Sequence, residues 1–259
     1  IIVHNLYGVD IEEQATEIAK LRLFLKLVAL LEPGDDIEPL PDIDFNIRHG
    51  NTLVGYATAD ETEKAVRGTV GGKLVGQATL LNDAWDEINI RLVKVGEEYN
   101  NFQIQQVQRG GHISSADKEA LADSLHDLEE TLNYHLAKEY GVDPTKTAKF
   151  EKWKSSHQPF HWYVDFFSLM ANGGFDVIVG NPPYVQLSEV TNYSLSKYAC
   201  AACGNLYAVV MERAAVLLQP DGRTGFIVPV SAISTDGYRT LQEVYSAASM
   251  IDPRACLMV

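Results

Sequence analysis

Apolar and polar residues near the start of the chain follow the spacing of strands that alternate with a helix. Residues 3–9 (VHNLYGV) predict a strand that ends at Asp10, and residues 12–31 carry apolar side chains at helical spacing. A second strand is predicted over residues 43–48 (IDFNIR). Strand, helix and strand in this order are typical of the βαβ unit of a parallel sheet.

The middle of the chain has a different pattern, rich in charged residues. Residues 73–108 and 115–139 predict two long helices. We expect these helices to form a hairpin with solvated faces that stands off the sheet and carries no active-site residues. The sequence therefore predicts a helical insertion over residues 58–157.

The strand pattern returns at residues 175–179 (FDVIV), a short apolar run typical of a buried strand. A helix is predicted over residues 205–218, and a Pro-Asp-Gly turn follows it at 220–222. A further buried strand is predicted over residues 224–229 and another helix over 237–248.

Composition narrows the class of protein. The chain has 259 residues, 46% of them hydrophobic, which is enough for a sizeable core. No apolar run reaches the roughly 18 residues that a membrane span needs. The net charge of −14 argues against binding nucleic acid through the overall field of the protein. The first residue is not Met and the sequence ends among apolar residues, so we expect a piece of a larger protein.

The three cysteines do not form a disulfide framework, which indicates a reducing, cytoplasmic setting. Cys200 and Cys203 have CxxC spacing, but a zinc or redox site needs a second ligand pair or a thioredoxin-like context. We therefore interpret both as small apolar residues and expect no metal in this segment.

The tetrapeptide Asn181-Pro182-Pro183-Tyr184 follows the predicted strand at 175–179. Two successive prolines remove two backbone N–H donors and fix φ near −65°, so neither strand nor helix continues. This loop therefore offers fixed carbonyl acceptors and few competing donors. The residues alone allow either a rigid turn that ends the strand or a site that uses these carbonyls as acceptors.

Asp10 stands at the predicted end of the first strand. In a doubly wound sheet, ligands bind beyond the carboxyl ends of the strands, where a carboxylate can accept hydrogen bonds from two ribose hydroxyls. Aspartate is also a preferred helix N-cap. Spacing alone leaves both interpretations of Asp10 open.

Three segments, LYGVDIEEQATEIAKLRLFL, NIRHGNTLVG and GGFDVIVGNPPYV, together resemble successive motifs of the amino-group DNA methyltransferases. The segments PFHWYVDFFSLM and GNLYAVVMERAAVLLQPDGRTGFIVPVS are similar to the same family. Its members transfer a methyl group from S-adenosylmethionine to adenine N6 or cytosine N4. The resemblance is strongest to the N6-adenine methylases of type II restriction–modification systems, some of which are fused to a nuclease.

The resemblance implies a role for each motif residue. Asp10 would bind the ribose hydroxyls of S-adenosylmethionine, and Asn51, where the family often has Asp, would contact the adenine of the cofactor. The motif Asn181-Pro182-Pro183-Tyr184 would form the target-base site. Asn181, Pro182 and Tyr184 are the expected catalytic residues, whereas Pro183 and Tyr184 are expected to bind the substrate base.

The chemistry of the target explains these residue types. The exocyclic amine of adenine has two N–H donors and a lone pair delocalised into the ring. The Asn181 side-chain oxygen and the Pro182 carbonyl can accept from both donors in a preorganised geometry. Tyr184 offers a flat face to a base rotated out of the duplex.

The expected fold is α/β, a partial Rossmann-like methyltransferase sheet with an inserted helical hairpin. The first sheet part spans residues 1–57, on the cofactor side, and the second spans 158–259, on the target side. The family's first strand with its Gly-rich cofactor loop is missing from the sequence, and so is a target-recognition domain. We therefore expect the isolated segment to be inactive and double-stranded DNA to bind mostly through parts outside it. The alternatives are a protein-glutamine methyltransferase, an RNA-base methyltransferase and a non-catalytic scaffold.

Overall fold

The computed structural model describes residues 2–31, 41–70, 73–74, 78–108 and 114–247. The first part of the chain forms a parallel pair of short strands in which Gly8 lies opposite Ile47 and Asp10 opposite His49. Its elements are α1 (Ile2–Asn5), β1 (Gly8–Asp10), α2 (Glu13–Val28) and β2 (Ile47–His49).

The strand predicted over residues 3–9 is wrong in its first half, because the chain there forms the short helix α1. The buried amide of Asn46 donates to the carbonyls of Val3 and Leu6 at 2.9 and 3.1 Å. These carbonyls are therefore satisfied by a side chain and not by a neighbouring strand. The second strand, expected over 43–48, is also shorter and begins only at Ile47.

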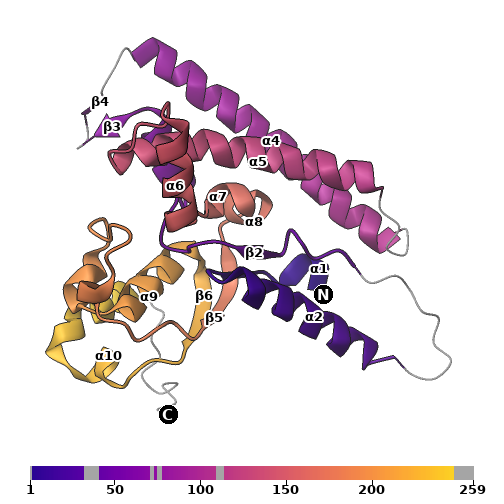
Figure 1. Cartoon of the computed structure of the whole chain (residues 1–259). Helices are drawn as coiled ribbons and strands as arrows, with labels where there is room; N and C mark the ends of the chain where they lie inside the picture. Colours follow the sequence, from indigo (N-terminus) through magenta and orange to yellow (C-terminus); the bar gives the residue numbers. More distant parts are fainter. Residues whose placement is uncertain (1, 32–40, 71–72, 75–77, 109–113, 248–259) are drawn as a thin grey trace.

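The middle of the chain is helical, as predicted, and α5 has the predicted bounds. The helix expected over 73–108 begins at Ala78, because Lys73 and Leu74 pair with the strand before them. In Figure 1, α4 and α5 lie side by side as two long helices. The elements are α3 (Ala59–Val66), β3 (Thr69–Val70), β4 (Lys73–Leu74), α4 (Ala78–Gln108), α5 (Ser115–Glu139) and α6 (Thr147–His157).

The hairpin does not stand off the rest of the molecule. Leucines at helical spacing along α5, including the fully buried Leu128 and Leu132, belong to one hydrophobic cluster with Val54 and Tyr56 from the segment after β2. The same cluster includes Val164 of α7. The expectation of a detached hairpin is therefore wrong, because the segment after β2 packs against one face of α5.

The last part of the chain contains the second parallel pair, β5 with β6. Leu218 lies opposite Phe175, but Arg223 lies opposite Val177, so the residues predicted as a Pro-Asp-Gly turn form an irregularity inside β6. The elements are α7 (Trp162–Asp165), α8 (Phe167–Ala171), β5 (Phe175–Gly180), η1 (Leu187–Glu189), η2 (Ala199–Cys203), α9 (Leu206–Leu217), β6 (Leu218–Phe226), α10 (Ser231–Ser234), η3 (Asp236–Tyr238) and α11 (Arg239–Ala247).

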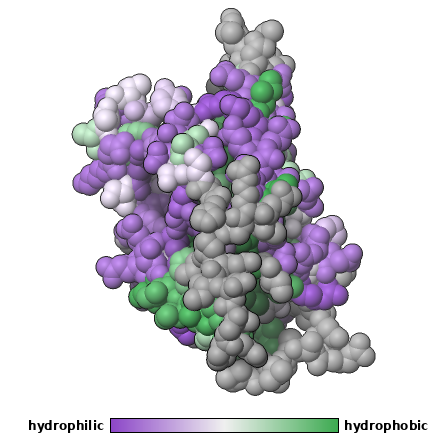
Figure 2. Space-filling view, turned by 90° about the vertical axis from the view of Figure 1, so that its right-hand side faces the viewer, coloured by the Kyte–Doolittle hydropathy of each residue, from purple (hydrophilic) through white to green (hydrophobic). Residues whose placement is uncertain are grey.

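The two parallel pairs remain separate two-stranded sheets in the described part of the chain. The narrow β1–β2 pair covers little of α2, whose Ile18, Leu21 and Leu25 are 57%, 57% and 60% exposed. Figure 2 shows a green, apolar area on this side of the molecule, below a largely purple surface. The helix predicted over 12–31 is thus present, but much of its apolar face is uncovered. The tail over 249–259 lies outside the described residues.

Candidate active site

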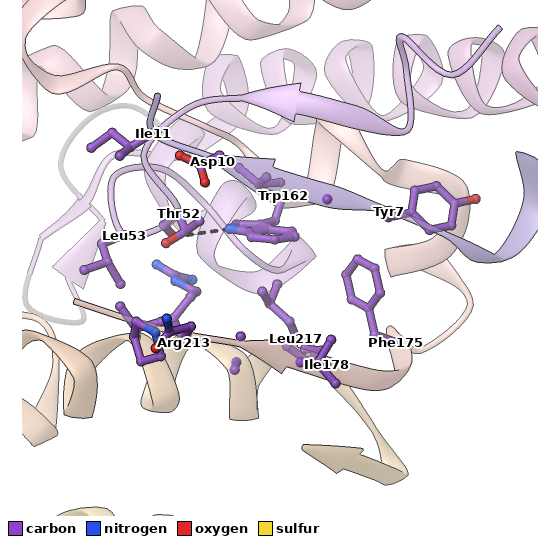
Figure 3. Close-up of a pocket in the computed structure, with 18 of the residues that line it drawn as sticks. Tyr7, Asp10, Ile11, Thr52, Leu53, Trp162, Phe175, Ile178, Arg213 and Leu217 are labelled. Atoms are coloured by element: carbon purple, nitrogen blue, oxygen red, sulfur yellow. Dashed lines mark hydrogen bonds between the residues drawn. The ribbon is translucent and has the colours of Figure 1, made fainter. Parts of the chain in front are cut away.

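A cavity of about 700 Å³ lies between the two parallel strand pairs. Asp10 and Asn51 reach it from the first part of the chain, and Asn181, Pro182 and Pro183 reach it from the loop after β5. Figure 3 shows Asp10 and Ile11 across the cavity from Ile178 and Leu217. The structure therefore brings five of the six predicted site residues to one cavity.

Asp10 lies at the carboxyl end of β1, and its exposed side chain lines the cavity. Its Oδ1 accepts a hydrogen bond from the backbone N–H of Glu12 at 2.8 Å. The N-cap of α2 is Glu12, so Asp10 precedes the capping position by two residues. The N-cap interpretation of Asp10 is therefore wrong, and its carboxylate retains acceptor positions for a ligand.

Asn51 is buried, with 4% of its surface exposed, and follows β2 by two residues. Its side-chain oxygen accepts from the Leu53 N–H at 3.0 Å, and its backbone N–H donates to the carbonyl of Gln158 at 2.7 Å. A Cβ on the preceding Gly50 would lie 2.8 Å from the Cβ of Phe160, so only glycine permits this close approach. The segment at 158–160 thus fixes Asn51 at the cavity wall.

The loop Asn181–Tyr184 is anchored at both ends. The Ile227 N–H donates to the carbonyl of Gly180 at 3.1 Å, and the Leu206 N–H donates to that of Val185 at 2.8 Å. Within the described residues, no hydrogen bond engages the Asn181 side chain or the Pro182 carbonyl. The loop therefore presents fixed acceptors that have no competing partner inside the chain.

Tyr184 lies beside the cavity and does not line it. Its hydroxyl donates to the carbonyl of Ile227 at 2.9 Å. Its ring packs edge-on against Tyr207, with centroids 6.0 Å apart, and the residue is still 52% exposed. Tyr184 is thus held at its tip while much of its surface remains open.

Arg213 of α9 also lines the cavity and is only 2% exposed. Its position at the cavity was not predicted, although a charged residue within the apolar run of the predicted helix 205–218 is a signal of a buried polar role. Trp162, whose Nε1 donates to the carbonyl of Thr52 at 3.2 Å, lines the same cavity (Figure 3).

The described ranges also bear on metal binding, on the cysteine pair and on membrane-spanning helices. They contain no group of three His, Cys, Asp or Glu side chains arranged to hold a metal ion. Cys200 and Cys203 are free thiols in η2, and Cys200 is fully buried. Within the same ranges, no helix has the length and apolar character to cross a bilayer.

Comparison with known proteins identifies the class. Residues 4–252 match the family described as Eco57I restriction-modification methylase, so the chain belongs to this family. A protein of Methanocaldococcus jannaschii described as a "Putative type II restriction enzyme and methyltransferase" is 30% identical over 264 residues. This match covers 89% of the chain but only 22% of that relative. No solved structure matches the chain.

Proposed function

We propose that this chain carries the cofactor side and the target side of an S-adenosylmethionine-dependent DNA methyltransferase. The target is the N6 amine of a flipped adenine, within a restriction–modification system. The observation that carries the proposal is the shared cavity, which Asp10 and Asn51 line together with Asn181 and Pro182. Family membership supports the same assignment.

The residues around the cavity fit the cofactor. The Asp10 carboxylate has acceptor capacity left for ribose hydroxyls, and the Asn51 oxygen keeps a second lone pair for an adenine amine. When bound, the cofactor supplies a methyl group on a positively charged sulfur.

The loop after β5 fits the amine that receives the methyl group. Asn181 Oδ1 and the Pro182 carbonyl accept its two N–H donors, which lets the nitrogen pyramidalise and turn its lone pair toward the cofactor. Because the prolines and the two anchoring hydrogen bonds fix the loop, these acceptors need little reorganisation during the reaction. The exposed ring of Tyr184 stacks on the base after it leaves the duplex.

A Rossmann-like sheet fits the way the two strand pairs meet. Among the residues that the structure describes, β1 and β5 each belong to a two-stranded sheet and so have one unpaired edge, and both strands line the cavity. In the complete protein we place one further parallel strand between them, paired with both edges. That strand fills the space between Val9 and Val177 and brings a Gly-rich cofactor loop to the side of Asp10. The carboxyl ends of β1 and β5 then form the mouth of the site.

Family membership favours DNA over the other substrates. A protein glutamine amide also presents a planar nitrogen with two hydrogens, so the loop alone cannot separate it from adenine. The matching family is one of restriction-modification methylases, whose substrate is DNA. A non-catalytic scaffold has no need of unoccupied acceptors in the loop at Asn181.

The test is methyl transfer from labelled S-adenosylmethionine by the complete protein to duplex DNA, structured RNA and protein. We expect label in DNA only, and nucleoside analysis to recover it as N6-methyladenine. Label in N4-methylcytosine would correct the target base, and label only in RNA or protein would overturn the DNA assignment. Cofactor binding without any transfer would indicate the scaffold.

A further inference from the structure

The segment that carries Asn51, residues 51–57, is held in place by other parts of the chain. Its residues Leu53, Val54 and Tyr56 are 2%, 1% and 4% exposed. Four successive carbonyls, from Thr52 to Gly55, accept hydrogen bonds from later segments. The donors are Trp162 Nε1 at 3.2 Å, Tyr198 Oη at 2.9 Å, the Phe160 N–H at 2.7 Å and Lys197 Nζ at 3.0 Å.

Arg213 is connected to this segment in two ways. Its Nε and Nη2 donate to the Tyr198 hydroxyl at 2.9 and 2.6 Å, and that hydroxyl in turn donates to the Leu53 carbonyl. Its Nη2 also lies 3.4 Å from the carbonyl of Gly55. The guanidinium therefore fixes the hydroxyl that holds Leu53 and contacts the segment directly.

The charge of Arg213 is stabilised although the side chain is buried. Burial alone lowers the pKa of Arg213, but Tyr198 and Glu61 outweigh it and raise that pKa. Glu61 Oε2 lies 3.3 Å from Nη1 and accepts the Ala57 N–H at 2.8 Å. The ion pair therefore also fixes the far end of the same segment.

The helix that carries Arg213 is anchored to the target side of the cavity. The N–H of Leu206, the first residue of α9, donates to the carbonyl of Val185, which directly follows Tyr184. Two turns later Arg213 is bonded to the segment that carries Asn51. A single rigid helix therefore spans the loop that contains Asn181 and the wall that contains Asn51.

We infer that Arg213 and Tyr198 are positioning residues. They hold Asn51 at a fixed position relative to the loop that contains Asn181 and thereby set the affinity for the cofactor. The inference rests on the proposed function, since it assigns these residues to the S-adenosylmethionine side of the site. Neither residue takes part in the chemistry. Tyr198 acts through the carbonyl of Leu53, and Arg213 acts through Tyr198 and through the carbonyl of Gly55.

The principal test is Tyr198→Phe in the complete protein. The change preserves the ring but removes the donor to Leu53 and the acceptor of Arg213. Tyr245→Phe is the matched control, because Tyr245 is also buried and its hydroxyl donates to a carbonyl of α9, that of Met211, at 3.0 Å. Tyr245 makes no hydrogen bond to the Asn51 segment in the described contacts.

Both variants should fold, and Tyr198→Phe should lose more thermal stability because it also removes the acceptor of two Arg213 donors. Calorimetry, well below either melting temperature, should show the dissociation constant for S-adenosylmethionine raised about tenfold in Tyr198→Phe, roughly the effect of one buried hydrogen bond. In Tyr245→Phe it should change less than about twofold. Hydrogen exchange without cofactor should be faster at residues 52–57 in Tyr198→Phe only.

Equal affinities in the two variants would overturn the inference and leave the proposed function intact. Failure of the parent protein to bind S-adenosylmethionine would refute the proposed function itself. A second variant, Arg213→Met with Glu61→Gln, removes both charges of the ion pair together, so neither charged partner is left alone. It should weaken cofactor binding at least as much as Tyr198→Phe, and unchanged affinity in this folded variant would also contradict the positioning role.

Discussion

The side chain of Asn181 is the sharpest test at the scale of single residues. Asn181→Ala removes one acceptor from the target amine, and the residue is exposed and precedes a proline, so Ala can share its extended backbone. The lost contact strengthens as the amine changes geometry, so turnover should fall while affinity for DNA and cofactor stays nearly constant. Loss of a comparable preorganised contact lowers rates by about 10²–10³.

Single-turnover methyl transfer by the complete protein measures this effect. Asn192→Ala is the control, because Asn192 is an exposed asparagine in the loop that follows. A rate close to that of the parent in Asn181→Ala would mean that the tetrapeptide is only a rigid turn.

Tyr184 should affect a different kinetic constant. Tyr184→Ala removes the stacking surface for the flipped base, which is worth about 1–3 kcal/mol, and should raise the DNA concentration that gives half-maximal rate. Tyr184→Phe keeps the ring and loses only the hydrogen bond to Ile227, so its constant should stay near that of the parent. Steady-state kinetics over a DNA titration would contradict the stacking role if both variants behaved alike.

Asp165 of α7 is a buried carboxyl that does not line the cavity. Its Oδ1 lies 2.7 Å from Arg48 Nη2, which also contacts Glu129 at 2.6 Å. Burial and the neighbouring Glu129 carboxylate raise the pKa of Asp165, whereas Arg48 lowers it by less. Asp165 is therefore protonated in the folded state at pH values where the unfolded chain has it ionised.

The raised pKa fixes the sign of a pH effect on stability. Above the ordinary Asp pKa of about 3.9, the folded state still holds the Asp165 proton while the unfolded chain has released it. The stability that this proton contributes is therefore complete below that pH and is lost as pH rises through the pKa of Asp165 in the folded state. Asp165→Asn keeps a neutral side chain at every pH. In thermal melts from pH 4 to 8, the stability of Asp165→Asn relative to the parent should rise as the pH rises. A difference between Asp165→Asn and the parent that stays flat over this pH range would contradict the assignment.

At the scale of elements, the sequence predicts what is encoded by a repeating local pattern. α5 and α9 have long apolar or amphipathic periods, and their bounds match the prediction within one residue. β1 is only three residues long and takes its conformation from pairing with β2, so the run over 3–9 could not distinguish it from α1. Likewise, the irregularity in β6 depends on its partner β5 and has no separate signal in its own residues.

The face of α5 that packs on the segment after β2 makes the next prediction. Leu132 is fully buried in the cluster shared with Tyr56 and Val164, so Leu132→Ala should lower the free energy of unfolding by about 2–5 kcal/mol. Ile90 of α4 is 70% exposed, and Ile90→Ala should change it by less than about 0.5 kcal/mol. Urea unfolding of the chain measures both. A small effect at Leu132 would favour the original prediction that α4 and α5 stand off the rest of the molecule.

At the scale of the whole molecule, the sequence indicates which residues favour burial but not which element covers them. The apolar spacing of α2 predicts a helix correctly, yet Leu25 is 60% exposed because the β1–β2 pair is too narrow to cover it. The positions of Asp10 and Asn181 at strand ends could be expected from the parallel-sheet rule. The contribution of Arg213 could not, because its partners Tyr198, Glu61 and Gly55 lie in three separate segments.

The open space between β1 and β5 leads to the last prediction, that the isolated 259-residue chain binds S-adenosylmethionine weakly or not at all. Asp10 and Asn51 can contact the nucleoside part, but the described residues offer no Gly-rich loop for the methionine part. Calorimetry should give a dissociation constant above about 1 mM, corresponding to less than ~4.1 kcal/mol of binding. The complete protein should bind far more tightly. Tight, stoichiometric binding by the isolated chain would mean that the cavity is already complete and that no further strand lies between β1 and β5.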